Sequence, residues 1–242
     1  MMERMSEASP RLKARIAGVF YLLTTATGFA EVVRGRLVVY SDAAATATNI
    51  LAHEPLFRLA FVADLIVNPC FIALTLLFFD LFKPVNRSLS LLAAFFSLVG
   101  CAIASLICLF QLAPLIVLGS AHNVSGFNVE QLQALALMFL KLHAQGYNVS
   151  LVFFGFYCLL IGYLIFRSTF LPRILGALMA IAGLCYLTSS FATFLSPGVA
   201  ARLFPYILVP GSVAELSLIL WLLVKGVNDQ RWKELKRAAV ER

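Results

Sequence analysis

The chain has 242 residues, of which 61% are hydrophobic and 13% are charged, and its mean hydropathy is +0.91. This balance excludes an ordinary soluble domain and predicts a helical protein that crosses a membrane several times. The net charge of +7 would suggest a nucleic-acid partner only if the basic residues gathered on one solvated face. They flank the apolar runs instead, so we expect the lipid bilayer as partner and no nucleic acid.

Six apolar runs are long enough to cross a hydrocarbon core of roughly 30 Å, which takes about 20 residues. They lie at residues 14–33, 56–82, 89–119, 147–166, 173–195 and 205–225. The first run follows basic residues, as in a secretory signal, but it continues to Glu31 and Arg34 without a convincing cleavage site, so we predict that it is retained. The predicted fold is all-α: a single six-span membrane domain over residues 14–226, after a cytoplasmic segment of residues 1–13.

The basic residues predict the orientation of this bundle, because cytoplasmic loops carry an excess of Lys and Arg. With a cytoplasmic N-terminus, the cytoplasmic side holds all but five of the 19 lysines and arginines. The five on the other side are Arg34, Arg36, Arg58, Lys141 and Arg202. We therefore expect both termini in the cytoplasm.

Two further helices are predicted on the extracytoplasmic side. Asp42, after Ser41, can cap a short helix over residues 43–52. Asn128, followed three residues later by Gln131, resembles a capping box ahead of a stretch with one apolar stripe, which suits a helix on the outer surface. The alternative is that this second helix only lengthens the fourth span.

Residues 227–242 are predicted as a basic cytoplasmic tail. Trp232, Leu235 and Ala239 fall on one face of a helix with basic residues nearby, a pattern that favours an anionic membrane surface. A frayed, solvated tail is the alternative. At the same boundary, interfacial ion pairs without chemistry are expected from Asp80, Lys83, Arg87, Arg167 and Arg173.

Three carboxylates interrupt the apolar runs, although a charge near a helix centre costs roughly 2.5–3.5 kcal/mol on insertion scales. At a rise of about 1.5 Å per residue, Glu31, Asp64 and Glu215 all fall at the midplane or in the outer half of the membrane. Asp64 and Asn68 share a helix face because they are four residues apart. We predict that these groups turn toward a common water-accessible cavity that opens on the outer side.

The predicted cavity also includes Arg58 as a charge partner and His143. Kinks expected at Pro69, Pro114 and Pro210 would free backbone carbonyls near the same level. The alternative is that Arg58 and Arg34 neutralise the carboxylates and only fix helix packing. The candidate cavity or ligand-binding residues are Glu31, Arg58, Asp64, Asn68, His143 and Glu215.

No motif in the sequence indicates a reaction. HExxH, GxSxG, the P-loop and the Rossmann glycine pattern are absent, so an enzyme is the less favoured class and no catalytic residue or cofactor is assigned. His143 with the three carboxylates would be an acceptable ligand set for a divalent metal, but a lone histidine is more often only hydrogen-bonded, and we assign no metal. The five cysteines lie in apolar runs without paired spacing and are interpreted as core residues.

Several stretches together resemble a known family. They are ARIAGVFYLLTTATGFAEVVRGRLV, DAAATATNILAHEPLFRLAFVADLI, KPVNRSLSLLAAFFSLV, LVFFGFYCLLIGYLIFRSTFLPRILGALMAIAGLCYL and VAELSLILWLLVKGVN. From about Lys13 to Asn228 the chain is similar to the prokaryotic membrane family described as domain of unknown function 4386. The resemblance implies a compact multi-span protein of a prokaryotic, for example bacterial, plasma membrane, and it implies no activity.

The same resemblance implies that certain polar residues occupy the family's recurring polar motifs. These residues are Glu31, Arg58, Asp64, Arg87, Arg167 and Glu215. One position departs from the family: the place of Tyr157 is often histidine there, so a mechanism that needs imidazole at this position is not expected, and Tyr157 is not assigned as catalytic.

Three functions are compatible with these observations. The first is a transporter-like or receptor-like protein that binds or moves a small molecule, a cation or a proton in the outer cavity. The second is an intramembrane enzyme that acts on a lipid-type substrate, with a carboxylate as general acid or base. The third is a non-catalytic membrane accessory subunit whose polar residues only fix packing.

Overall fold

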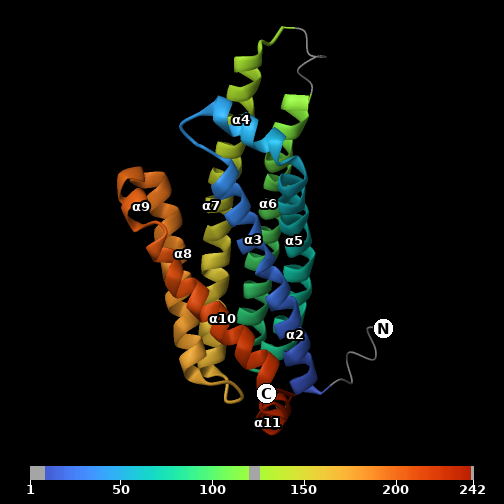
Figure 1. Ribbon diagram of the computed structural model, residues 1–242. Helices are drawn as coiled ribbons and strands as arrows, with labels where there is room; N and C mark the ends of the chain where they lie inside the picture. Colours follow the sequence, from blue (N-terminus) through green and yellow to red (C-terminus); the bar gives the residue numbers. More distant parts are fainter. Residues whose placement is uncertain (1–8, 120–125, 241–242) are drawn as a thin grey trace. The chain divides into compact units, whose positions relative to one another are not determined.

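The computed structural model of the protein describes residues 9–119 and 126–240, which excludes most of the predicted segment 1–13. The described chain is helical and contains no strand (Figure 1). Its elements, in order, are α2 (Pro10–Thr24), α3 (Ala26–Leu37), α4 (Ala43–Ala52), α5 (Glu54–Phe82), α6 (Arg87–Gly119), α7 (Val129–Arg167), α8 (Arg173–Leu195), α9 (Pro197–Leu203), the 3₁₀ turn η1 (Tyr206–Leu208), α10 (Val209–Val224) and α11 (Asp229–Val240).

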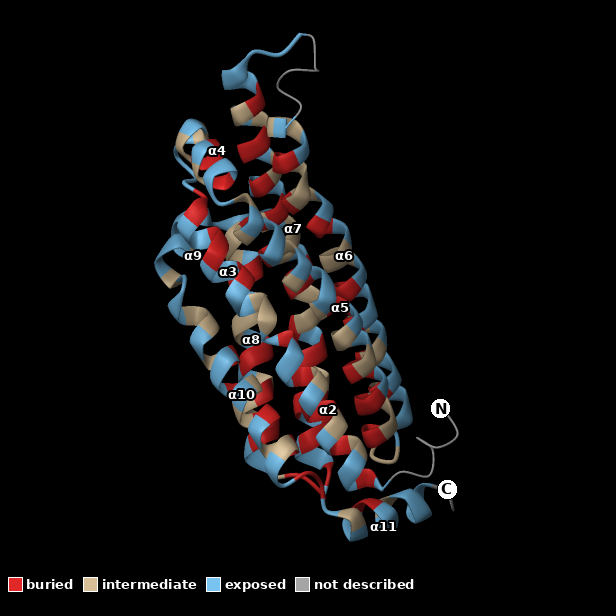
Figure 2. Cartoon of the chain, turned by 45° about the vertical axis from the view of Figure 1, so that its right-hand side comes forward, coloured by how far each residue is buried: buried red, intermediate tan, exposed pale blue. Residues whose placement is uncertain are grey.

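Six helical stretches of the described chain are long and apolar enough to cross a membrane. They are Pro10–Leu37, Glu54–Phe82, Arg87–Gly119, Val129–Arg167, Arg173–Leu195 and Tyr206–Val224. Large apolar side chains such as Leu106, Leu109 and Ile116 on α6 are exposed, as expected for contact with lipid. Figure 2 shows exposed positions along α6. The predicted six-span helical fold is confirmed.

The fourth span differs from the favoured prediction. We expected a separate surface helix before residue 147, whereas α7 runs without a break from Val129 to Arg167. Gly146 lies inside this helix, and its missing side chain leaves the space that Ile107 of α6 occupies. The predicted capping box is confirmed: Asn128 and Gln131 exchange backbone-to-side-chain hydrogen bonds of 2.9 and 2.8 Å. The prediction of a separate surface helix is therefore wrong, and the alternative of a lengthened span holds.

The other short outer helix forms as predicted. Asp42 caps α4, since its Oδ1 accepts a hydrogen bond of 2.9 Å from the Ala45 N–H. The prolines act in two different ways. Pro69 and Pro114 lie inside α5 and α6, whereas Pro210 lies in the first turn of α10, where a missing N–H costs no helical hydrogen bond.

The chain divides into two compact units. Unit 1 comprises Met1–Leu23, Cys70–Cys101 and Asn148–Arg242, and unit 2 comprises Thr24–Pro69 and Ala102–Tyr147. The boundary between the units falls inside α5, α6 and α7 and before the last residue of α2.

Unit 1 is built around closely packed helices and aromatic rings. A Cβ added at Gly162 of α7 would lie 2.7 Å from both the Gly176 carbonyl oxygen and the Ala180 nitrogen of α8. Gly155 and Gly183 make a similar backbone approach one heptad away. Small residues let helices come this close in a membrane, where dispersion contacts take the place of the hydrophobic effect.

Unit 2 has a smaller apolar cluster with a polar region beside it. The cluster joins α3, α4, α5, α6 and α7 through ten buried residues: Ala30, Val33, Leu37, Val38, Ile50, Phe57, Ala60, Leu115, Leu137 and Leu140. The α4 helix is fixed to the end of α3, because the Asn49 side chain donates a hydrogen bond of 3.2 Å to the Leu37 carbonyl. The Thr46 hydroxyl also bonds the Val39 backbone at 2.9 Å.

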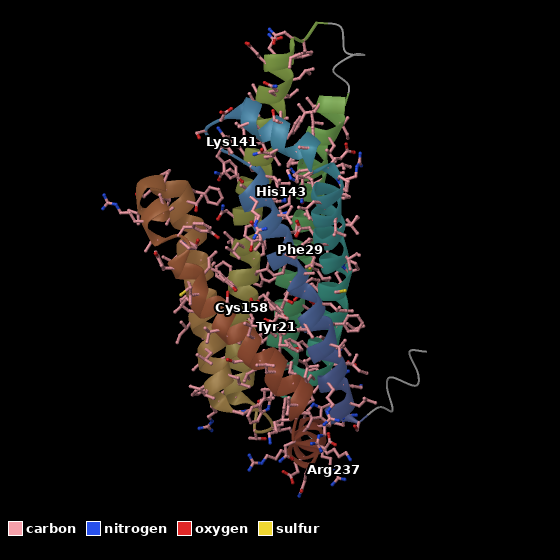
Figure 3. The ribbon with its side chains drawn as sticks, viewed as in Figure 1. Tyr21, Phe29, Lys141, His143, Cys158 and Arg237 are labelled. Carbon is pink, nitrogen blue, oxygen red and sulfur yellow. The ribbon has the colours of Figure 1, made fainter. Side chains whose placement is uncertain are left out.

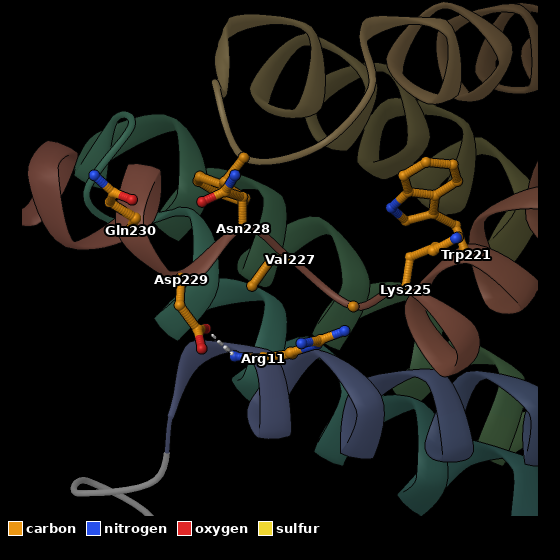
Figure 4. Close-up of a pocket in the computed structure, with 9 residues that line it drawn as sticks. Arg11, Trp221, Lys225, Val227, Asn228, Asp229 and Gln230 are labelled. Atoms are coloured by element: carbon orange, nitrogen blue, oxygen red, sulfur yellow. Dashed lines mark hydrogen bonds between the residues drawn. The ribbon is translucent and has the colours of Figure 1, made fainter.

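The first and last helices of unit 1 meet at one end. The Arg11 N–H donates a hydrogen bond of 2.7 Å to Oδ1 of Asp229, shown as a dashed line in Figure 4. Gly226 makes the turn between α10 and α11 with a φ of 67°, a conformation that glycine adopts without strain. The start of α2 and the start of α11 therefore lie on the same side of the membrane, as an even number of spans requires.

The predicted tail forms the amphipathic helix α11. Trp232 is buried, and its Nε1 donates a hydrogen bond of 2.9 Å to the Leu81 carbonyl at the end of α5. Leu235 packs against the core of unit 1, while the basic residues of α11 are exposed. The helix is thus attached to the bundle, and the alternative of a frayed tail does not hold for the described residues.

Candidate functional site

A buried arginine in unit 2 bridges two carboxylates. Nη1 of Arg34 on α3 donates to Oδ2 of Asp64 on α5, and Nη2 donates to Oε1 of Glu31 at 2.7 Å. The Thr27 hydroxyl donates a further hydrogen bond of 2.9 Å to Oδ1 of Asp64. Both oxygens of Asp64 are therefore bonded, and both terminal nitrogens of the guanidinium are used. We call Thr27, Glu31, Arg34 and Asp64 the Arg34 cluster.

The local helix geometry explains why these side chains meet. Side chains of an α-helix lean toward its N-terminus, so the long side chain of Arg34 extends back along α3 toward Thr27 and Glu31. Residues three apart share a helix face, which places Glu31 beside Arg34. Asp64 approaches from α5 at the same level, and the cluster closes across two helices.

Burial distinguishes the members of the Arg34 cluster. The side chains of Arg34 and Asp64 are only 6% and 9% exposed, whereas that of Glu31 is 54% exposed. With all three groups ionised, one positive charge faces two negative charges, so the cluster carries an excess negative charge. Removing such ions from water costs several kcal/mol each unless they are well paired.

Neutral polar side chains surround the Arg34 cluster within unit 2. Asn68 is buried and donates a hydrogen bond of 3.1 Å to the Asp64 carbonyl one turn earlier on α5. Cys108 of α6 is close enough to Arg34 and Asp64 for their charges to act on it, and His143 of α7, labelled in Figure 3, is close enough to Arg34 for the same. The charged groups of α3 and α5 are thus faced by polar groups of α6 and α7.

Gln111 is the least satisfied polar side chain of this region. It is fully buried on α6, one turn beyond Cys108, and neither its amide nitrogen nor its amide oxygen finds a hydrogen-bond partner among the described residues. Two contacts join α6 to α7: Ile107 packs on Gly146, and the ring of Phe110 stacks on that of Phe139. Gln111 follows Phe110 on α6 and therefore lies beside the helical turn of α7 that precedes His143. A buried amide without partners costs about 1–3 kcal/mol per group, so a polar ligand or water is expected here.

Glu215, also predicted for the site, lies in unit 1 with different partners. It accepts a hydrogen bond of 2.8 Å from the Tyr186 hydroxyl. Its charge is also close enough to act on three other side chains, which are Tyr21, Tyr157 and Cys158. Tyr21 and Cys158 lie at a similar level in the view of Figure 3. Among the described residues no Lys or Arg pairs with Glu215, unlike Glu31 and Asp64, which share Arg34.

Arg58 is not brought into contact with Asp64. Its Nε donates to Oε1 of Glu54 at 2.7 Å, one turn earlier on α5, and both side chains are exposed. Six residues separate Arg58 from Asp64, which places them on different faces of α5. The described contacts thus join Glu31 and Asp64 through Arg34, place Asn68 and His143 nearby, and put Arg58 on the surface.

Sequence reasoning underestimated Arg34, which it treated only as a possible neutralising charge. The i, i+3 spacing of Glu31 and Arg34 was the sequence feature that could have identified it. In the described part of the chain, no group of three or more His, Cys, Asp and Glu side chains is arranged to hold a metal ion. The contacts that the structure does show at this place are charge pairs and hydrogen bonds of the Arg34 cluster.

The fold and this buried charge cluster define a multi-pass α-helical membrane protein. Residues 16–226 match the family described as domain of unknown function (DUF4386), and the chain belongs to this family, as its resemblance predicted. A protein of Archaeoglobus fulgidus, itself described as uncharacterized, is 26% identical over 146 residues, which cover 60% of this chain and 70% of that protein. No solved structure matches the chain.

Proposed function

We propose that this membrane protein binds and exchanges a proton or a small cation at the Arg34 cluster, in a transporter-like or receptor-like role. The observation that carries the proposal is that one guanidinium serves two carboxylates. Polar and ionisable groups inside a span are costly, and they mark ion pathways and ligand sites more often than packing contacts. An excess negative charge at this depth attracts a positive ligand.

The two carboxylates have separate roles in this proposal. Asp64 is buried and bonded at both oxygens, by Thr27 and by Arg34, so it holds the arginine in place. Glu31 is more than half exposed, and Arg34 is its one partner among the described residues. Glu31 is therefore the group that exchanges the proton or cation, and Asp64 is a positioning residue.

Neutral acceptors on α6 and α7 would complete the ligand's surroundings. Gln111 carries an unpaired amide oxygen, and His143 lies nearby without an ion-pair partner in the described chain. Small cations in proteins are bound mainly by oxygen ligands, both carboxylates and neutral carbonyl or amide oxygens. In this proposal Gln111 and His143 orient the ligand or its water, whereas Glu31 supplies the charge.

The experiment uses purified protein in proteoliposomes that contain a pH-sensitive dye, with a potassium diffusion potential as driving force. We expect wild-type protein to admit protons faster than empty liposomes, and Glu31→Gln to lose most of this rate. Glu130→Gln, which removes an exposed carboxylate at the start of α7 in the same unit, is the matched control and should keep the wild-type rate.

A second arm covers cations other than the proton. The unfolding temperature of wild type, Glu31→Gln and Glu130→Gln is measured with sodium, potassium, magnesium or tetramethylammonium chloride at constant ionic strength. A ligand at 100 times its Kd stabilises the folded state by about 2.7 kcal/mol, so a bound cation should raise the unfolding temperature only where Glu31 is intact. If Glu31→Gln behaves as wild type in both arms, the proposal fails.

A further inference from the structure

A pocket of about 490 Å³ lies in unit 1 at the end where α5 leads into α6. Its lining combines three basic side chains, Lys83, Arg87 and Arg167, with an apolar wall from α11. This wall is made by Leu235, Ala238 and Ala239. The pocket is thus cationic on one side and apolar on the other.

The charges at this pocket are incompletely neutralised. Asp80 is the nearby acid, and it pairs with Lys83 at 2.6 Å and with Lys13 at 3.5 Å. Arg87 and Arg167 have no acidic partner within the described ranges 9–119 and 126–240, although ion pairs were expected at this boundary. Two exposed arginines of the pocket lining are therefore available to an anion.

The helix ends strengthen the preference for an anion. Arg87 is the first residue of α6, a helix of 33 residues, and Asn86 caps it through a hydrogen bond of 2.9 Å to the Leu89 N–H. The N-terminal end of a helix carries a partial positive charge and favours anions such as phosphate. Arginine adds a planar, two-pronged donor that matches phosphate oxygens.

The apolar wall indicates which phosphate compound fits. The Trp232 indole fixes α11 to the end of α5, and Leu235 packs on the bundle, so the helix is held with its apolar side against the pocket. A soluble phosphate would gain nothing from this wall, whereas a phospholipid places its phosphate beside an apolar glycerol and acyl region. Basic pockets at the cytoplasmic ends of spans suit anionic headgroups.

We propose that this pocket binds the phosphate of an anionic phospholipid on the membrane face predicted to be cytoplasmic, with Arg87 and Arg167 as the phosphate donors. Lys83 remains with Asp80 and completes the positive surroundings. The site is independent of the Arg34 cluster, because it uses none of the same residues.

A second pocket at the same end of unit 1, of about 440 Å³, provides a comparison. Arg11 and Lys225 line it, but so does Asp229, which Figure 4 shows between α2 and α11. This carboxylate offsets the basic charge within the lining itself. The pocket of Arg87 and Arg167 contains no acidic lining residue and is therefore the stronger phosphate site.

The test measures the unfolding temperature of the full-length protein in detergent while dioleoyl phosphatidylglycerol is added. Dioleoyl phosphatidylcholine and inorganic phosphate are titrated in parallel. The variant Arg87→Gln/Arg167→Gln removes the proposed donors. The matched control Lys233→Gln/Arg237→Gln removes the same charge from exposed positions of α11 that do not line the pocket; Figure 3 labels Arg237.

We expect phosphatidylglycerol to raise the unfolding temperature of both wild type and the control by several degrees. The lipid concentration that gives half of the maximal rise should be the same for these two proteins. The Arg87/Arg167 variant should need about 10-fold more lipid or show no rise. The proposal is overturned if this variant responds as the control does, or if phosphatidylcholine stabilises wild type equally. It is also overturned if inorganic phosphate reproduces the whole effect, since the ligand would then be a soluble anion.

Discussion

The two units hold their helices together by different means. In unit 1, α7 and α8 approach until the backbone of one touches the backbone of the other at glycines, and rings such as Tyr21 and Phe78 pack edge to face at 6.1 Å. In unit 2, helices α3 and α5 are joined through Arg34 and Asp64, a buried charge pair. Shape specifies the first arrangement, whereas charge pairing specifies the second.

The difference matters because a membrane bundle does not need buried ions to pack. Glycine-mediated contacts of the kind seen in unit 1 join helices without desolvating any charge. Replacing a buried ion pair by apolar groups is often neutral or stabilising in proteins. Holding two helices by the buried charge pair of unit 2 therefore costs desolvation free energy that apolar contacts would not cost. For this reason we propose that the pair serves a function.

The largest effect is expected from Gly162→Val in unit 1. Its new side chain would meet the α8 backbone at Gly176 and Ala180, which cannot move aside as a flexible side chain can. We expect a loss of more than about 4–5 kcal/mol in the free energy of unfolding, and hence little folded protein. Size-exclusion chromatography and thermal unfolding in detergent measure this.

The control for Gly162→Val is Gly35→Val in unit 2. A Cβ at Gly35 would meet no atom within 4 Å, so this variant should fold normally. If the two valine variants were equally stable, close backbone contact at glycines would not be what holds α7 and α8 together in unit 1. The proposed difference between the two units would then be wrong.

A smaller but still large effect is expected from Asp64→Asn in unit 2. The change leaves Arg34 buried with Glu31 alone, and breaking one side of a buried pair costs about 3–5 kcal/mol. Thermal unfolding should show this loss, and Arg34→Gln combined with Asp64→Asn should recover part of it. Arg58→Gln, which breaks an exposed pair, should change stability by less than about 1 kcal/mol.

Recovery in the double variant also separates packing from function. If the protein regains stability but loses the ion-dependent responses of the wild type, the pair serves the ligand. If the double variant recovers both the stability and the ion-dependent responses of the wild type, Arg34 and Asp64 serve only helix packing. This result would favour an accessory membrane subunit.

An effect smaller than that of Asp64→Asn is expected from Tyr186→Phe, which removes one hydrogen bond to Glu215 in unit 1. A hydrogen bond to a charged group contributes about 1.5–3 kcal/mol, and a neutral one less. We expect a lower unfolding temperature than for the control Tyr206→Phe, a residue that is 76% exposed. A loss as large as that of Asp64→Asn would show that unit 1 also depends on a polar core.

The sequence predicted the spans well because hydropathy and charge bias are local properties. It also identified the Asp42 cap and the Asn128–Gln131 capping box, which depend on residues close in the chain. The continuity of α7 was missed because Gly146 looks like a helix breaker until Ile107 of another helix is placed beside it.

The candidate site was predictable only in part. Glu31, Asp64 and Asn68 could be predicted as site residues from the polar faces of single helices. The pairing of Asp64 with Arg34 could not, because it joins residues 30 positions apart and depends on how two helices are rotated about their axes. Arg58 was predicted as a charge partner in the cavity, whereas the structure pairs it with Glu54, four residues away on the same helix face. A single shared cavity with Glu215 stays a prediction.

The junction between Arg11 and Asp229 has a practical consequence for handling the protein. Because α2 and α11 start side by side, reporters fused ahead of α2 and after α11 should report the same compartment. Two copies can then be joined tail to head by a short flexible linker that never has to cross the bilayer. Such a concatenated pair would let one copy carry a variant while the other stays intact.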